Sequence, residues 1–257
     1  GDAPADFQRL APSFTVSLQP WQEQLLFLRL MYKSTFRMPT FNDLYYYRLG
    51  NRSLRPEKAN EYNMGITWSR SFSSFLNYLS VTVDGYYNDV TDKIVAFPTT
   101  YAWKMANYGK VHVTGMDATL AAAASLGKNM VLVVSGGYTW QKAIDLTDAT
   151  SKSYKDQLPY TPKHSGNVSA VLEMPWVNVG YSIVGVSERY SMSQNIPENR
   201  IDGYMEHTAS LSRNFSFRHC KLRLQAEIIN MTDTQYDVIK YYPMPGRSWR
   251  LTGTIEF

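Results

Sequence analysis

The chain has 257 residues, enough for one large β domain or two ordinary ones. Charged residues make up only 19% of it, below the roughly 25% of typical soluble domains, and the formal charge of +4 is spread along the chain, so no basic segment indicates nucleic-acid binding. The single cysteine, Cys220, excludes an intrachain disulfide and a cysteine-based metal site, and the lack of any run of about eighteen apolar residues predicts no transmembrane helix.

Alternating apolar and polar residues predict strands in the first half of the chain. Phe14, Val16 and Leu18 share one side of a strand, because successive side chains point to opposite faces. By this criterion, strands are expected at about residues 13–19, 24–35, 62–69, 79–88 and 107–124. Residues 36–57 and 95–104 contain prolines and do not alternate, so both stretches are predicted as loops, and no substantial helix is expected.

The second half continues the same pattern and gives about eleven strands in all. Further strands are expected at about residues 130–140, 168–174, 177–183, 205–211, 221–228 and 248–257. Connections near residues 20, 73, 127, 175 and 217 are short, whereas those near 46, 100, 153, 197 and 240 are long. Short turns at one end and long loops at the other predict an all-β, antiparallel, up-and-down transmembrane β-barrel wall.

The last two strands show the two faces most clearly. The apolar side of the first carries alternate residues from Leu222 to Ile228, and that of the second carries alternate residues from Trp249 to Phe257. Aromatic side chains near the ends of the apolar faces suit the interfacial girdles of a barrel. The girdle residues expected are Trp68, Tyr87, Trp140, Tyr181, Trp249 and Phe257.

Four motifs then resemble the C-terminal barrel portion of TonB-dependent outer-membrane receptors. FRMPTFNDLYY with GNRSLRPEKANEYNMGI (residues 36–66) resembles the loop-and-strand signature of that family. NYGKVHVTGMDATL (107–120) and YTPKHSGNVS (160–169) resemble two later strands, and IINMTDTQYD with YYPMPGRSWRLTGTIEF (228–257) resembles the final hairpin. The resemblance implies a 22-stranded barrel closed by an N-terminal plug and energised through TonB.

This resemblance also sets expectations about what the chain contains. It supplies about 11–12 strands, and residues 1–257 are expected to form one barrel segment without a plug domain or a TonB box. The N-terminal sequence looks cut, so the chain is interpreted as a possible fragment. If a meander with an odd number of strands closed on itself, its first and last strands would pair in parallel, which single-chain bacterial barrels avoid. Three arrangements are therefore considered for the edges of the sheet: irregular closure, a twelfth strand from residues 1–10, and pairing with another copy of the chain.

No enzyme is expected. His112, His164, His207 and His219 are scattered without a metal-binding or catalytic spacing and are interpreted as ordinary surface or lumen residues. Neither a metal site nor a cofactor is expected. Substrate contacts are expected on the long loops, where aromatic side chains bind ring faces at low entropic cost. The substrate-binding candidates are Tyr45, Tyr46, Tyr47, Arg48, Tyr101, Trp103 and Tyr154.

The basic residues of the longest loop leave three interpretations open. Arg37, Arg48 and Arg52 would attract an anionic ligand such as a ferric chelate, or would face lipopolysaccharide phosphates or pair with Asp43 and Glu57. Phe257, a terminal aromatic after an alternating strand, resembles the membrane-insertion signal read by the barrel-assembly machinery.

The resulting expectation is a receptor barrel in the Gram-negative outer membrane for uptake of a large, scarce nutrient of the ferric-chelate, corrinoid or glycan class. This chain would carry barrel wall and extracellular loops, not gating. Expected partners are outer-membrane lipid, lipopolysaccharide, the barrel-assembly machinery, and the plug and TonB of the full receptor, with no nucleic acid. The alternative is a complete small barrel that acts as a passive pore or adhesin.

Overall fold

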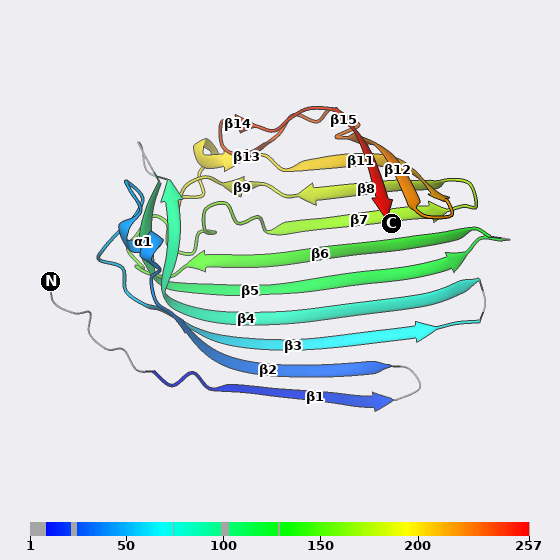
Figure 1. The fold of residues 1–257 in the computed structure, drawn as a ribbon. Helices are drawn as coiled ribbons and strands as arrows, with labels where there is room; N and C mark the ends of the chain where they lie inside the picture. Colours follow the sequence, from blue (N-terminus) through cyan, green and yellow to red (C-terminus); the bar gives the residue numbers. More distant parts are fainter. Residues whose placement is uncertain (1–8, 22–24, 74, 99–102, 128, 257) are drawn as a thin grey trace.

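The computed structural model describes residues 9–21, 25–73, 75–98, 103–127 and 129–256. Eleven strands form one antiparallel sheet in which each strand pairs with its neighbours in chain order (Figure 1). They are β1 (Ser13–Trp21), β2 (Leu26–Arg37), β3 (Glu57–Ser71), β4 (Leu76–Pro98), β5 (Trp103–Ser125), β6 (Val131–Asp145), β7 (His164–Glu173), β8 (Asn178–Val186), β11 (Tyr204–Ser216), β12 (Lys221–Ile229) and β15 (Ser248–Glu256). The up-and-down antiparallel barrel wall predicted from the sequence is confirmed.

The sheet has an apolar face and a polar face, as the alternation predicts. In the last hairpin, Leu222 lies opposite Ile255 and Ala226 opposite Leu251, while Glu227 lies opposite Arg250 on the other face. The apolar face carries large exposed side chains along the whole sheet, among them Leu30, Met64, Ile66, Leu120, Val168, Leu211, Leu224 and Leu251. The polar face instead carries paired polar groups, such as Arg29 with Asp84 at 2.9 Å and Thr139 with Asp117 at 2.6 Å. Apolar side chains that stay exposed along one entire face suit a lipid-facing surface.

The connections that follow β1, β3, β5, β7 and β11 are short and lie at one end of the sheet (Figure 1). Those at the other end are long, except the one between β4 and β5, where the two strands themselves are longer than their neighbours. We call the long-connection end the crown. It comprises residues 38–56, 92–98, 103–107, 146–163, 187–203 and 230–247. Four short strands and one 3-10 helix lie there: β9 (Arg189–Tyr190), β10 (Arg200–Ile201), β13 (Asp237–Ile239), β14 (Tyr242–Pro243) and η1 (Pro197–Asn199).

Two loop predictions need correction. Most of the loop expected at 95–104 is strand, because β4 and β5 continue beyond their neighbours and pair with each other as far as Pro98 and Trp103. This extension is stabilised by burial, since Ile94 and Met105 form a small core with Leu54. The loop expected at 36–57 begins and ends inside strands and contains a one-turn helix, α1 (Phe41–Tyr45).

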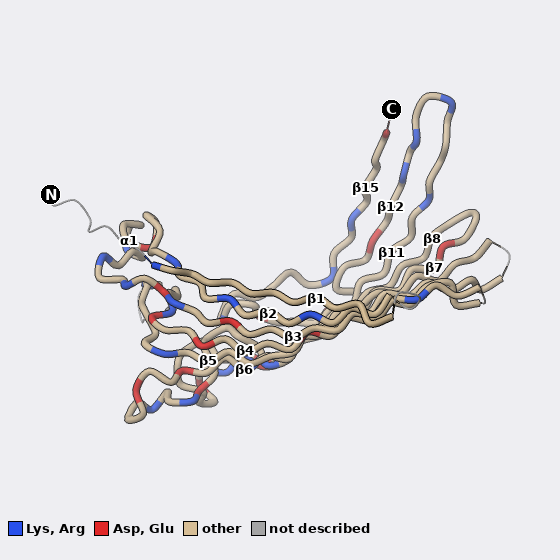
Figure 2. The backbone as a smooth tube through the Cα atoms, turned by 90° about the horizontal axis from the view of Figure 1, so that it is seen from below, with Lys and Arg blue, Asp and Glu red and all other residues tan. Residues whose placement is uncertain are grey.

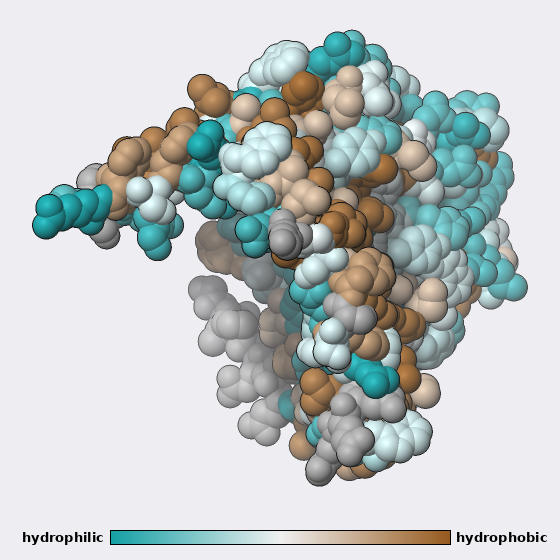
Figure 3. Space-filling view, turned by 90° about the vertical axis from the view of Figure 1, so that its right-hand side faces the viewer, coloured by the Kyte–Doolittle hydropathy of each residue, from teal (hydrophilic) through white to brown (hydrophobic). Residues whose placement is uncertain are grey.

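The barrel is not closed in this chain. β1 and β15 are the two ends of the strand order, and β15 projects away from the rest of the wall together with the hairpin of β11 and β12 (Figures 2 and 3). Of the twelfth strand considered for residues 1–10, residues 1–8 lie outside the described residues, while Arg9 and Leu10 are exposed and belong to no strand. Among the described residues, no helix has the length and apolarity needed to cross a membrane.

The buried core lies where the crown meets the polar face of the sheet and not in the middle of the wall. Leu158, from the connection between β6 and β7, packs against Ala59, Val90, Val111 and Ala143 on the polar face of the sheet. Val111 is fully buried there. The strands therefore hold the long connections over the polar face through a small conventional core, while the apolar face remains open.

Candidate functional site

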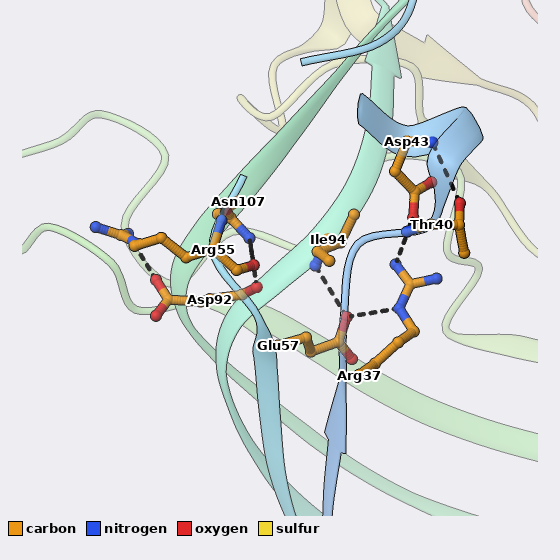
Figure 4. Close-up of polar contacts among 8 residues, drawn as sticks. All are labelled: Arg37, Thr40, Asp43, Arg55, Glu57, Asp92, Ile94 and Asn107. Carbon is orange, nitrogen blue, oxygen red and sulfur yellow. Dashed lines mark hydrogen bonds and ion pairs between the residues drawn. The ribbon is translucent and has the colours of Figure 1, made fainter. Parts of the chain in front are cut away.

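The first crown connection, residues 38–56, is built around α1. The Thr40 Oγ1 accepts a hydrogen bond from the Asp43 backbone N–H at 3.2 Å, and the Asp43 carboxylate accepts one from the Thr40 N–H at 2.9 Å (Figure 4). This reciprocal capping box satisfies two N–H groups at the start of the helix. The helix ends at Tyr45, so the three tyrosines at positions 45–47 lie at its C-terminal end.

Arg37 fixes this connection to the end of β2. Its guanidinium lies 3.9 Å from the Asp43 carboxylate and 3.7 Å from that of Glu57 (Figure 4). Glu57 in turn accepts a hydrogen bond from the Ile94 N–H at 2.9 Å. Of the three interpretations left open for Arg37, the structure supports pairing with Asp43 and Glu57.

A second polar cluster joins the end of the same connection to β4 and β5. The Arg55 guanidinium lies 2.6 Å from the Asp92 carboxylate. The Asn107 amide accepts from the Arg55 N–H at 2.8 Å and donates to the carbonyls of Arg55 and Asp92 at 3.0 and 2.6 Å (Figure 4). Together with the Leu54 core, these bonds make residues 38–56 an ordered surface.

Three consecutive tyrosines of this surface face solvent. Tyr45, Tyr46 and Tyr47 are 50%, 60% and 79% exposed. The Arg52 guanidinium lies 5.2 Å from the Tyr45 ring centre and that of Arg48 lies 5.2 Å from the Tyr47 ring centre. Such cation–π contacts hold the arginines beside the rings. Within the described part of the chain neither Arg48 nor Arg52 has a carboxylate partner, so both stay available to an anion. We call residues 45–48 and Arg52 the tyrosine platform.

The other sequence candidates lie on neighbouring parts of the crown. Trp103 is the first residue of β5 and packs on the Tyr160 ring with centroids 5.5 Å apart. Burial raises the pKa of Tyr160 above its usual range. Tyr154 is half-buried and carries Lys155 over its ring at 5.3 Å. Tyr101 lies outside the described residues, as does Phe257.

A further crown cluster could not be found from the sequence. Arg189 is only 4% exposed and donates to the carbonyls of Asp237 and Val238. Its guanidinium also lies 5.8 Å from the Tyr204 ring centre, and Tyr204 stacks on Tyr236 with ring centroids 3.9 Å apart. The Tyr236 hydroxyl donates to the Glu206 carboxylate, and burial together with that carboxylate raises the pKa of Tyr236. This cluster ties the last two long connections together.

The described residues assemble no metal site. No group of three or more His, Cys, Asp or Glu side chains there is placed to hold a metal ion. His112, His164 and His207 lie on the apolar face, where each contacts a tyrosine hydroxyl.

Comparisons with known proteins agree with this architecture. Residues 1–231 match the sequence model of the family described as TonB dependent receptor-like, beta-barrel. The vitamin B12 transporter BtuB of Photobacterium profundum is 25% identical over 230 residues, which cover 86% of this chain and 34% of the relative. The chain thus spans about a third of the length of that relative.

Solved structures share the fold. The ferric citrate transporter FecA superposes with a TM-score of 0.73 at 16% identity, covering 95% of this chain and 37% of FecA. The siderophore receptor PiuA from Acinetobacter baumannii gives a TM-score of 0.70 at 19% identity, covering 95% of this chain and 35% of PiuA. The family match spans nearly the whole chain, and the antiparallel wall with its crown has the same fold as these receptors, so the chain belongs to the TonB-dependent receptor β-barrel family.

Proposed function

We propose that this chain forms wall and crown of an outer-membrane receptor that takes up a large, scarce nutrient of the ferric-chelate, corrinoid or glycan class, with energy delivered through TonB. The family membership supports the receptor barrel and the TonB partnership. The apolar face supports the membrane location, because its large side chains are exposed to whatever surrounds the sheet. Phe257 would serve as its insertion signal. The relatives are described as transporters and receptors, so we do not propose the pore or adhesin.

The tyrosine platform is the observation that supports ligand capture by this chain. Three exposed phenol rings and two guanidinium groups without carboxylate partners among the described residues lie on one ordered connection. Exposed aromatic rings of this kind are costly unless they meet a ligand or a partner. Trp103 and Tyr154 would extend the contact from neighbouring connections, and Tyr101 is proposed with them on sequence grounds alone.

Growth under nutrient limitation tests this proposal. The intact receptor would be expressed in a strain that lacks it, with ferric chelates, corrinoids or glycans supplied as the only source of the limiting nutrient. Replacing Tyr45, Tyr46 and Tyr47 together by Ala should raise the concentration needed for growth by about tenfold or more, the usual effect of removing aromatic contacts at the centre of a binding surface.

The control is the double variant Tyr241→Ala, Tyr242→Ala. These tyrosines are 82% and 70% exposed but lie on the last crown connection, between β12 and β15. The double variant should grow as the wild type does. Wild-type growth of the triple variant on every nutrient that the receptor supports would refute the platform as the capture site. A selective loss with Arg48→Gln and Arg52→Gln would identify an anionic ligand.

A further inference from the structure

Arg189 is a buried cation without a counter-charge. It is 4% exposed, and its Nη2 donates to the carbonyls of Asp237 and Val238 at 2.5 and 3.0 Å. Its Nη1 is buried and has no hydrogen-bond partner among the described residues. Charged side chains are almost never buried unless they are paired, because removing a charge from water is costly. The unpaired Nη1 is therefore a site that an anion would stabilise.

The acidic residues of the same cluster do not neutralise this charge. The Asp237 Oδ2 accepts a hydrogen bond from the Tyr241 N–H at 3.0 Å. The Glu206 carboxylate accepts one from the Tyr236 hydroxyl. In the part of the chain that the structure describes, no carboxylate lies within ion-pair distance of Arg189. The guanidinium therefore retains a positive charge that the crown itself does not balance.

The bonds at Nη2 hold the guanidinium in place for an incoming anion. Both carbonyls belong to β13, and the Tyr204 ring centre lies 5.8 Å from the guanidinium carbon. A planar guanidinium has N–H donors on all its edges, so Nη1 is able to bind an oxygen of a carboxylate or a phosphate. Because the group is already fixed, little conformational entropy is lost when such an anion binds.

Two aromatic rings connect this buried charge to the surface. The Tyr160 N–H donates to the carbonyl of Tyr190, the residue after Arg189, at 2.8 Å. Burial raises the pKa of the Tyr160 hydroxyl, while the Lys240 N–H and the positive charge of Arg189 act in the opposite direction, so this hydroxyl lies in the field of the guanidinium. Trp103 packs on the Tyr160 ring, with centroids 5.5 Å apart, and is itself 38% exposed. The series runs from an exposed ring to a half-buried ring and then to the charge.

The outer ring of this series stands at the end of a two-stranded extension. β6 ends opposite Val111, so β5 pairs only with β4 from Trp103 to Lys110. A two-stranded ribbon has fewer neighbours than the rest of the wall, and such segments open at a lower free-energy cost than the body of a sheet. Displacing Trp103 would therefore uncover Tyr160 without disturbing the ladder of the main sheet.

We propose that Arg189 is an anion-binding subsite of the crown, covered by Tyr160 and Trp103 until a ligand displaces them, and that its Nη1 pairs with a carboxylate or phosphate group of the nutrient. The exposed tyrosine platform meets the ligand first, and Arg189 then holds its charge. This inference rests on the proposed uptake function and narrows the nutrient to one that carries an anionic group. A guanidinium that only tethers β13 would never meet an added anion, which separates the two roles.

Chemical labelling of guanidinium groups tests whether an added molecule reaches the subsite. Phenylglyoxal would be added to the purified intact receptor in mild detergent, and labelled arginines identified by peptide mass spectrometry. In the wild type, Arg200, whose side chain is 52% exposed, should react readily and Arg189 slowly. Trp103→Ala should raise the labelling rate of Arg189 about tenfold, because labelling follows the population of the open state.

Matched variants separate loss of the cover from a general loosening of the receptor. Trp249→Ala removes a tryptophan that is 73% exposed on the wall and should leave the labelling rate of Arg189 unchanged. Tyr160→Leu removes the inner ring and should act in the same direction as Trp103→Ala, so it provides the test if the latter fails to fold, as judged by heat-modifiable gel mobility. Rapid labelling of Arg189 in the wild type, or slow labelling in the folded variants, would overturn the cover.

The same assay with added anions tests the class of ligand. Ferric citrate and inorganic phosphate would be added to the Trp103→Ala receptor as carboxylate and phosphate probes, and maltotriose as an uncharged probe. At least one of the two anions should slow the labelling of Arg189 about threefold or more, since occupancy reduces the free guanidinium by the factor 1 + [probe]/Kd. Maltotriose should not slow it. No slowing by either anion, or equal slowing of Arg189 and Arg200, would overturn the anion subsite.

Growth with charge variants connects the subsite to uptake. Arg189→Gln retains an amide that donates to carbonyls but removes the charge, whereas Arg189→Lys retains the charge. With the nutrient that supports growth, Arg189→Gln should raise the concentration needed about tenfold, because a charge-assisted bond is lost, and Arg189→Lys should raise it less. Wild-type growth of Arg189→Gln, or growth supported only by an uncharged glycan, would contradict the role in uptake. Labelling does not depend on growth, so failure of the tyrosine platform and failure of this subsite are distinguishable.

Discussion

The wall and the crown of this receptor barrel place leucine side chains in opposite environments, as Leu158 in the crown and Leu251 in the wall show. Leu158 is 4% exposed and lies in a protein core, whereas Leu251 is 80% exposed on the apolar face. In the crown, water surrounds the protein and hydrophobic groups pack inward. In the wall, backbone ladders satisfy the polar groups and hydrophobic side chains point out to lipid. Packing of side chains against one another therefore stabilises the crown. Backbone hydrogen bonds between strands, together with contact between apolar side chains and lipid, stabilise the wall.

Truncating the two leucines sharpens this comparison most. Leu158→Ala should cost about 2–5 kcal/mol of local stability, because it leaves a cavity against Ala59, Val90, Val111 and Ala143. The connection between β6 and β7 should then open locally, while the wall stays folded. Hydrogen exchange at the Leu158 amide, which donates to the Ala143 carbonyl at 2.8 Å, reports this opening.

The matched variant is Leu251→Ala on β15. Lipid or detergent fills the space that its side chain leaves, so no protein cavity forms and the change in stability should be much smaller. If Leu251→Ala destabilised the receptor as much as Leu158→Ala does, the two regions would not differ in the way their side chains stabilise them.

Adding a charge to the apolar face is a second test of how the wall is stabilised. Leu120 lies on the apolar face of β5, 40% exposed, near the middle of the part that crosses the membrane. Leu120→Arg should cost about 2–4 kcal/mol, the usual penalty for a cation near the bilayer midplane. Urea titration of the receptor in liposomes, followed by heat-modifiable gel mobility, measures it.

The neighbouring residue provides the control for this change. Thr119 is exposed on the polar face, one position before Leu120, so Thr119→Arg should leave the stability nearly unchanged. A similar loss for both arginines would show that strand β5 rejects the bulk of the side chain and not its charge.

The wall could be predicted from the sequence and most of the crown could not. Alternation alone places Leu224 and Leu251 on one face, because the side-chain period of a strand is fixed and lipid demands apolar groups on that face. The extension of β4 and β5 was missed because its stability comes from burial of Ile94 and Met105 against Leu54, which is distant in sequence. The short helix α1 did have a local signal, the Thr40-to-Asp43 capping box.

The candidate site also has features that could be predicted from the sequence and features that could not. The exposure of Tyr45, Tyr46 and Tyr47 follows from three consecutive aromatics that no alternating pattern can bury. The partner of Arg37 could not be chosen, because Asp43 and Glu57 were as plausible as a ligand until the fold placed them within ion-pair distance. The tyrosine–histidine pairs depend on strand register, which relates residues 25 or 26 positions apart.

The smallest expected effect is a pH response confined to the crown. Hydrogen bonds from the Thr150 hydroxyl and N–H, at 2.7 and 2.8 Å, lower the pKa of the Asp148 carboxyl below its ordinary value of 3.8. A depressed carboxyl pKa stabilises the folded turn above 3.8, and this stabilisation is lost as the pH falls through the lower, folded value. The Thr150 amide should therefore lose hydrogen-exchange protection only in acid. Asp148→Asn should remove that pH dependence, because an amide does not ionise. An unchanged pH profile in the variant would show that another group controls the turn.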